Sequence, residues 1–174
     1  MTNSTTTIRP ARFPEDAATL RELFRLYAQG LGVDLGFQDF EAELAGLPGK
    51  YAPPEGAALL AESAGGMVLG CVAMRPLGNG TCEMKRLFLR PEARGLGLGR
   101  VLAQAIVAAA RAAGYRRMVL DTLATMTGAL SVYRGLGFAE TAPYYHNPLA
   151  GAVFLALDLA APSERDRQPP EGVT

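Results

Sequence analysis

A glycine-rich turn between an apolar run and a long helical segment constrains the fold of this chain more than any other feature. The turn is Arg94-Gly95-Leu96-Gly97-Leu98-Gly99-Arg100, and it follows Leu87-Phe88-Leu89. This order predicts a strand, a tight turn and the start of a helix. Backbone N–H groups converge in such a turn and the helix start carries a partial positive charge, so we expect the turn to hold a phosphate or pyrophosphate.

The spacing of the glycines separates the known phosphate-binding turns. The dinucleotide fingerprint requires glycines at positions one, three and six, but the sixth position here is Arg100. The P-loop pattern, with four residues between its glycines and then Gly-Lys-Ser/Thr, is absent. The pattern that fits is Arg-x-x-Gly-x-Gly, formed by Arg94, Gly97 and Gly99. A turn whose glycines serve packing alone is the alternative, and three alternating glycines between two arginines disfavour it.

Composition and charge limit the partners of the chain. Its 174 residues include 17 Lys and Arg and 17 Asp and Glu, so the formal net charge is zero and nothing favours nucleic acid or an anionic membrane. No apolar run has the length of a membrane span, and residues 1–7 do not resemble a signal peptide. We expect a cytoplasmic protein with one domain over residues 1–160. A charged, proline-rich tail over residues 161–174 is expected to be mobile.

Apolar periodicity and turn residues predict a mixed sheet with helices on both faces, an α/β fold. Gly65-Gly66 and Gly78-Asn79-Gly80 are hairpin signals that make three strands an antiparallel meander. A right-handed crossover after the glycine turn makes the next strand parallel to the strand before it. The predicted strands cover residues 6–11, 57–62, 67–74, 81–89, 117–121, 138–141 and 152–157. Four helices are predicted. The first begins within residues 12–16 and ends near 30–32, and the others cover residues 37–47, 98–113 and 127–136. The helix over residues 98–113 is expected to bury one stripe of side chains: Val101, Leu102, Ala105, Ile106 and Ala109.

This order of elements and the Arg94–Arg100 turn resemble the GNAT superfamily of acetyl-CoA-dependent N-acyltransferases, from Thr6 to Leu159. The resemblance implies a central mixed sheet of about seven strands in which the two central parallel strands splay apart. It implies that the backbone of Leu87, Phe88 and Leu89 pairs with the pantetheine arm of acetyl-CoA, while the side chains of these residues serve the core. It also implies that the residues of the glycine turn bind the pyrophosphate: Arg94, Gly95, Leu96, Gly97, Leu98, Gly99 and Arg100. For the two arginines, a solvated position at the surface is the alternative.

Tyr133 is the candidate general acid. It precedes Arg134-Gly135-Leu136-Gly137-Phe138, which matches the Tyr-x-x-x-Gly-Phe signature of the family. In the family this hydroxyl lies near the coenzyme sulfur, and a phenol with a pKa of about 10 keeps a proton that it can donate to a departing thiolate. The alternative is a tyrosine that only packs. One residue departs from the family, because Met126 stands where many members have an asparagine.

The general base has three candidates. Some members of the family use a glutamate at the position of Glu83, and others place a base at the position of Asp121. Many members use only water. The alternative for Glu83 is a salt bridge with Lys85, and the alternative for Asp121 is a structural role in a turn at the end of its strand. A bulge in the strand would also change the face to which Glu83 points.

The acceptor side is predicted only in outline. Tyr144 and Tyr145 could line a substrate pocket, whereas a lone loop histidine such as His146 is more often solvated. Phe37, Phe40 and Tyr51 could wall the other side, but the spacing of the two phenylalanines favours core packing. Cys71 and Cys82 lack metal or disulfide spacing and are expected to be small buried side chains.

The function implied is transfer of an acetyl group from acetyl-CoA to a primary amine by direct attack on the thioester. No metal and no covalent enzyme intermediate are expected, and the acceptor is a small molecule or a peptide. The alternatives are a different acyl group, an alcohol acceptor, a sensor that binds acyl-CoA without turnover, or a nucleotide-binding protein of another fold, which the glycine spacing disfavours. Dimers are common in the family, so both a monomer and a homodimer stay open.

Overall fold

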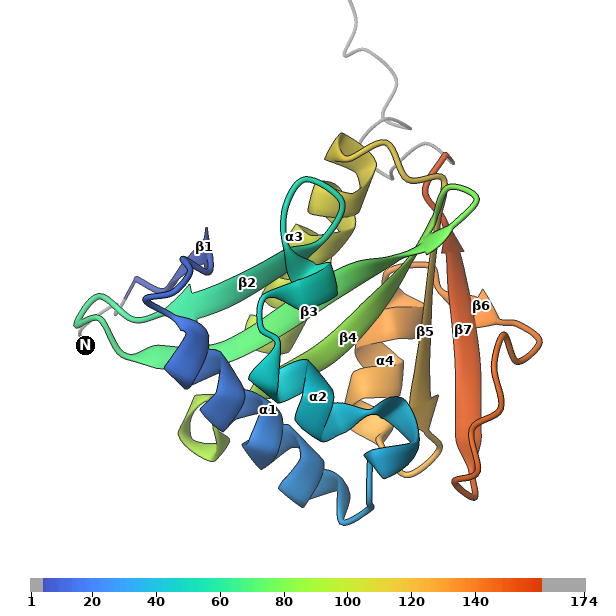
Figure 1. The fold of residues 1–174 in the computed structure, drawn as a ribbon, viewed down its shortest axis with the longest axis horizontal. Helices are drawn as coiled ribbons and strands as arrows, with labels where there is room; N and C mark the ends of the chain where they lie inside the picture. The colour runs from blue at the N-terminus through green and yellow to red at the C-terminus, as the bar shows by residue number, and fades with distance from the viewer. Residues whose placement is uncertain (1–4, 161–174) are drawn as a thin grey trace, which may run out of the picture.

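A seven-stranded mixed sheet forms the centre of the computed structural model, which describes residues 5–160 (Figure 1). The strand order is β1-β2-β3-β4-β5-β7-β6. Only β4 and β5 pair in parallel, and every other neighbouring pair is antiparallel. The predicted fold class is therefore confirmed, whereas the expected tail over residues 161–174 lies outside the described residues. The strands are β1 (Thr7–Pro10), β2 (Ala57–Glu62), β3 (Val68–Gly78), β4 (Thr81–Leu89), β5 (Arg117–Leu123), β6 (Ala139–Glu140) and β7 (Ala152–Asp158).

Helices cover both faces of the sheet (Figure 1). Helices α1 (Ala17–Leu31) and α2 (Phe40–Ala45) lie on one face, where the core includes Leu20, Phe24 and Phe40. Helices α3 (Leu98–Ala112) and α4 (Thr127–Gly135) lie on the other, over a larger core that includes Leu102 and Ile106. The described residues also contain three short 3-10 turns: η1 (Gly36–Gln38), η2 (Gly49–Tyr51) and η3 (Pro91–Ala93).

The predicted helix over residues 37–47 is wrong in one respect, because it is broken. Asp39 adopts a left-handed backbone conformation with φ of 54°, which ends η1 and begins α2 as a separate helix. A left-handed residue cannot continue a right-handed helix. Tyr51, considered above as a possible wall of the acceptor pocket, lies in η2 and is buried against Phe24 with the two rings at 77°.

The buried face of α3 is rotated about the helix axis relative to the predicted stripe. Leu102 and Ile106 are buried as expected, but Val101 is 42% exposed. The flank that includes Ala103 and Val107 faces the sheet instead. The mostly small side chains on both flanks left the direction of the helix undetermined by periodicity alone.

Two irregularities in the middle of the sheet create the space for a site. The parallel ladder between β4 and β5 contains three residue pairs and ends at Glu83–Val119, although β4 continues to Leu89 and β5 to Leu123. This is the splay that the family resemblance implies. A β-bulge also interrupts the pairing of β3 with β4, where Arg86 adopts a φ of 61°. A bulge adds one residue to a strand and changes the face of the side chains beyond it.

Candidate active site

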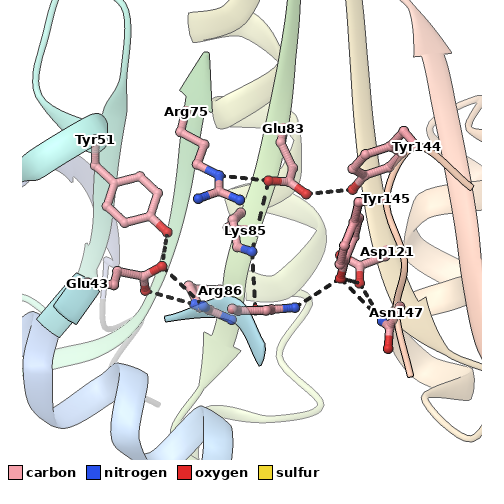
Figure 2. Close-up of polar contacts among 11 residues, drawn as sticks. Glu43, Tyr51, Arg75, Glu83, Lys85, Arg86, Asp121, Tyr144, Tyr145 and Asn147 are labelled. Atoms are coloured by element: carbon pink, nitrogen blue, oxygen red, sulfur yellow. Dashed lines mark hydrogen bonds and ion pairs between the residues drawn. The ribbon is translucent and has the colours of Figure 1, made fainter. Parts of the chain in front are cut away.

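The bulge determines which side chains of β4 meet on the face of α1 and α2. Glu83, Lys85 and Arg86 all lie on this face, because the left-handed Arg86 breaks the alternation of side chains. Leu87 packs instead with the core under α3. Glu83 and Leu87, four residues apart, would share a face in a regular strand. The bulge therefore separates a polar site from an apolar core within one strand, and Figure 2 shows the side chains of the polar site.

A narrow cleft lies between the splayed strands. It has a volume of about 40 Å³ and passes the side chains of Tyr27, Met126 and Tyr133. Its strand walls are residues 84–87 of β4 and residues 120–123 of β5. Of the three residues predicted to pair with pantetheine, Leu87 lines this cleft, while Phe88 and Leu89 continue the same strand toward the glycine turn.

The glycine turn presents a row of backbone donors beside α3. Gly95 and Gly97 have φ of 80° and 77°, so they occupy conformations that other residues rarely adopt. Within residues 5–160, the backbone N–H groups of residues 95–100 donate to no backbone or side-chain acceptor. Four unpaired N–H groups are normal at a helix start, and an anion is their natural partner.

The two arginines of the turn lie apart from each other. Arg94 folds back so that its Nε donates to the carbonyl of Leu89 at 3.2 Å and its guanidinium lies over the ring of Phe88. Arg100 extends toward α4, where its Nη1 lies close to Gly135. Both side chains are at the surface of the turn.

Tyr133 has a buried ring and a hydroxyl that faces the cleft. The residue is 7% exposed, and the ring packs against Phe138 with 5.9 Å between the ring centroids. Within the described residues the hydroxyl has no hydrogen-bond partner, and it is not sealed from solvent. Burial raises the pKa of Tyr133 above the usual value of a phenol. The hydroxyl therefore holds its proton at neutral pH.

A second pocket, of about 580 Å³, lies over the parallel ladder, since Thr81 and Glu83 of β4 and Arg117 and Val119 of β5 are among its lining residues. Glu83 is 1% exposed and stands at its base, where one carboxylate oxygen accepts from Nε of Arg75 at 2.8 Å and the other from the hydroxyl of Tyr144 at 2.6 Å. Nζ of Lys85 lies 3.9 Å from the same carboxylate. Burial would raise the pKa of Glu83, but the charges of Lys85 and Arg75 and the hydrogen bond from Tyr144 together lower it. Glu83 is therefore ionised (Figure 2).

Asp121 lies on β5, where it binds residues of the loop that precedes β7. It lies within β5, because this strand extends to Leu123, so the expectation of a strand-end turn residue is wrong. Its carboxylate accepts from the hydroxyl of Tyr145 and, at 2.8 Å, from Nδ2 of Asn147. Both partners come from the loop that precedes β7 (Figure 2). Asp121 thus anchors this loop to the sheet and already has two donors.

Gln38 and Lys85 line both spaces and form the wall between them. Nζ of Lys85 donates to Oε1 of Gln38 at 3.2 Å, and Nε2 of Gln38 donates to the hydroxyl of Tyr145 at 3.1 Å. This chain of contacts links the sheet, η1 and the loop before β7. The sequence interpretation missed Gln38 and Arg75 as site residues and considered Lys85 only as a partner of Glu83. Three charged residues at positions 83, 85 and 86 of an otherwise apolar strand were the available signal.

The remaining candidates lie elsewhere. His146 is exposed and lines neither space. Phe40 and Tyr51 are buried in the core beneath α1 and α2, which confirms the packing role expected for Phe40. Within residues 5–160, no group of three or more His, Cys, Asp and Glu side chains could hold a metal ion. Of the helices described, none has the length and apolar character needed to cross a membrane.

Comparison with known proteins identifies the family. The family model described as "Acetyltransferase (GNAT) family" matches residues 18–138. An uncharacterised N-acetyltransferase of Schizosaccharomyces pombe is 44% identical over 161 residues, which cover 92% of this chain and 99% of that protein. Mouse N-acetyltransferase 8F1 is 28% identical over 81% of this chain and 67% of its own length.

Solved structures agree in fold. A Klebsiella pneumoniae protein named as an acyl-CoA N-acyltransferase superimposes with a TM-score of 0.70 at 26% identity, covering 90% of this chain and 99% of that one. A Salmonella typhimurium protein named as an acetyltransferase and solved with acetyl-CoA has a TM-score of 0.66 at 24% identity, covering 92% and 99%. With the splayed sheet, the glycine turn and these matches together, the chain belongs to the GNAT family of acetyltransferases.

Proposed function

We propose that this protein transfers the acetyl group of acetyl-CoA to a primary amine by direct attack, with the thioester at the boundary between its two spaces. The observation that carries this proposal is the shared wall of Gln38 and Lys85. One space leads toward the glycine turn and the other contains an ionised, buried carboxylate. A thioester in the first and an amine in the second would meet beside this wall, and such positioning can supply much of a rate enhancement.

The coenzyme would be held mainly by backbone. The N–H groups of residues 95–100 would receive the pyrophosphate, and the unpaired edge of β4 from Leu87 to Leu89 would pair with the amides of pantetheine. Gly95, Gly97 and Gly99 would leave room for the phosphates, with Leu96 and Leu98 contributing N–H groups. Arg94 and Arg100, which are exposed at the turn, would add charge-assisted contacts.

The chemical step would use two proton transfers. The neutral amine attacks the thioester carbonyl carbon, and its surplus proton passes through a water molecule to Glu83. The lowered pKa of Glu83 keeps it ionised, so it is ready to accept. The carbon–sulfur bond then breaks, and the hydroxyl of Tyr133 donates its proton to the departing thiolate. The products are the acetylated amine and CoA, and solvent reprotonates Tyr133 while Glu83 releases its proton to solvent.

Thermal unfolding with acetyl-CoA tests the cosubstrate, with NAD and ATP as controls. A ligand at a hundredfold excess over its dissociation constant stabilises the folded state by about 2.7 kcal/mol. We expect acetyl-CoA alone to raise the midpoint, and CoA release over a broad amine panel to show turnover. A shift with NAD or ATP would disprove the assignment of the glycine turn. Binding of acetyl-CoA without CoA release from any amine would instead identify a sensor.

A further inference from the structure

The second pocket contains more positive than negative charge. Among its lining residues, Arg75, Lys85 and Arg117 are cationic, and Glu83 and Asp39 are acidic. Asp39 is exposed, so Glu83 is the single buried carboxylate that faces the two buried or half-buried cations. A buried cation without a matching anion is costly, and a ligand that brings the anion removes this cost.

Arg75 has donors left for such a ligand. Its Nε is used by Glu83, and its side chain is 26% exposed. Within residues 5–160, its Nη1 and Nη2 donate to no protein group. Figure 2 shows the guanidinium beside Glu83, and both residues line the second pocket. A guanidinium with two nitrogen donors available is suited to bind a carboxylate through two parallel hydrogen bonds.

Lys85 lies deeper, next to the wall between the two spaces. It is 7% exposed, and its one hydrogen bond among the described residues goes to the neutral Gln38. Burial lowers the pKa of Lys85 to about 8, and the opposing attraction of Glu83 does not compensate. Among the described residues, Glu83 is the one carboxylate within ion-pair distance of both Lys85 and Arg75. A ligand carboxylate placed between these two cations would therefore be stabilised by both.

The same charges disfavour other acceptors. A polyamine would bring a second ammonium group to a pocket whose only buried carboxylate already has Arg75, Tyr144 and Lys85 around it. Leu77, Val119 and Tyr145 supply apolar wall area. The volume of about 580 Å³ lies within the range of roughly 300–1,000 Å³ typical of small-molecule pockets.

We propose that the acceptor is a small amine that carries a carboxylate, as an α-amino acid does, with the carboxylate bound by Arg75 and Lys85 and the amine directed toward the coenzyme cleft. This inference rests on the proposed function and names the substrate class of the same site. The rim cation Arg117 would attract such a molecule to the pocket, and the apolar wall would take its side chain.

Matched acceptor pairs test the inference. CoA release is measured for apolar α-amino acids, for the corresponding amino-acid amides and for the amines that lack the carboxyl group, with rates compared per concentration of neutral amine. A diamine and a polyamine complete the panel. We expect kcat/KM to be roughly tenfold to hundredfold higher for the amino acids than for the amides, which is the usual effect of a hydrogen bond to a charged group.

Variants of Arg75 separate binding of the carboxylate from support of Glu83. Arg75→Gln should raise KM for the amino acid roughly tenfold or more and remove the preference over the amide. The amide measures whatever the variant does to Glu83, because both acceptors share the chemical step. Arg75→Lys keeps the charge and should restore part of the preference. The control is Arg25→Gln, which removes an exposed charge from α1 and should leave both acceptors unchanged.

Three results would overturn the inference. Equal or faster acetylation of the amides or the polyamine would reject the carboxylate while leaving acetyl transfer intact. An amino-acid preference that survives in Arg75→Gln would mean that this pocket does not select the carboxylate. If acetyl-CoA stabilises the protein and no amine of any kind releases CoA, the proposed function fails and the substrate class with it.

Discussion

Single side chains carry the chemistry proposed for this protein, and a substitution of Tyr133 tests the proposed proton donor alone. Replacing Tyr133 with Phe removes the proton donor and keeps the ring that packs against Phe138. We expect kcat to fall by about 10²- to 10⁴-fold, the usual contribution of a general acid, with the thermal shift from acetyl-CoA retained. Tyr115→Phe is the control, because its hydroxyl donates to the carbonyl of Glu55 elsewhere. Unchanged turnover in Tyr133→Phe would remove Tyr133 from the acid role.

A second residue-scale prediction concerns Asp16, which joins the start of α1 to β1. Hydrogen bonds from Arg9, together with one from the backbone N–H of Arg12, lower the pKa of Asp16 from 3.8 to about 2. The unfolded chain therefore binds a proton more readily than the folded one. The resulting stability, about 2 kcal/mol at 1.36 kcal/mol per pKa unit, is complete above pH 3.8 and disappears as the pH falls toward 2.

Urea unfolding of Asp16→Asn against the natural protein, between pH 7 and pH 3, measures this contribution. The difference in unfolding free energy should be about 2 kcal/mol at pH 7 and should shrink below pH 4. Glu15→Gln, at the exposed neighbouring position, serves as the control. A difference that stays constant over this range would show that Asp16 stabilises the fold through shape and not through charge.

At the scale of elements, a buried ion pair attaches α2 to the bulge in β4. Arg86 makes two hydrogen bonds to Glu43, at 3.0 and 3.1 Å, and its guanidinium lies over the rings of Tyr27 and Phe40. The hydroxyl of Tyr51 donates to the same carboxylate. The Arg86 side chain is 2% exposed, so removal of Glu43 would leave a buried charge without its partner.

Glu43→Ala should therefore destabilise the fold by about 3 kcal/mol or more. The double variant Glu43→Leu with Arg86→Met should recover most of this loss, because apolar replacement of both partners removes the uncompensated charge. Thermal and urea unfolding measure both effects, with Glu41→Ala on the same helix as the exposed control. If the double variant is less stable than Glu43→Ala, the pair has a net stabilising value of its own.

In the glycine turn, we expect alanine substitutions at Gly97 and Gly99 to change the stability of the fold in opposite directions. Gly97 has a φ of 77°, so Gly97→Ala should lower stability by about 1 kcal/mol through backbone strain. Gly99 lies within α3, where an added Cβ would make an ordinary 3.6 Å contact with Leu89, so Gly99→Ala should raise stability by about 0.5 kcal/mol. Both variants should weaken the thermal shift from acetyl-CoA, because each adds a methyl group to the proposed phosphate site. Full retention of the shift in both would place the pyrophosphate elsewhere.

Most elements of this fold could be predicted from the sequence, since turn glycines and apolar periodicity act locally. The hairpins at Gly66 and Asn79 and the helix after the glycine turn are examples. The break at Asp39 could not be predicted, because the apolar spacing of Phe40 and Leu44 continues the helical pattern across it. The bulge at Arg86 was equally hidden, since a non-glycine residue with positive φ carries no distinct sequence signal.

At the scale of the whole molecule, the sequence named more residues for the proposed coenzyme side of the site than for the proposed acceptor side. The turn around Gly97 and the Tyr133 signature are contiguous in the chain, so both were recognisable. The acceptor pocket joins residues distant in sequence, such as Gln38 and Tyr145, which are 107 residues apart. Such a contact depends on how η1 and the loop before β7 pack across the splay, and no local pattern encodes it.

The splay also makes a prediction for the whole sheet. If acetyl-CoA pairs with β4 where β5 does not, backbone N–H groups in residues 84–89 and 95–100 should exchange hydrogen more slowly when it is bound. Exchange in β1 and β2, far from the cleft, should not change. Mass spectrometry of deuterium uptake with acetyl-CoA, and with ATP as control, measures this. Slowing confined to residues 95–100 would indicate phosphate binding without pairing of pantetheine to the strand.

The three-pair ladder between β4 and β5 also affects the rigidity of the sheet. It divides the sheet into two half-sheets that share one short seam, one carrying β1 to β4 and the other β5 to β7. A cosubstrate bound beside that seam would connect the two half-sheets, so the sheet would be most rigid with acetyl-CoA bound and least rigid after CoA has left. Each turnover would then include a cycle of stiffening and loosening, and the acceptor pocket beside the seam would be most precisely shaped when an acetyl group is present to be transferred.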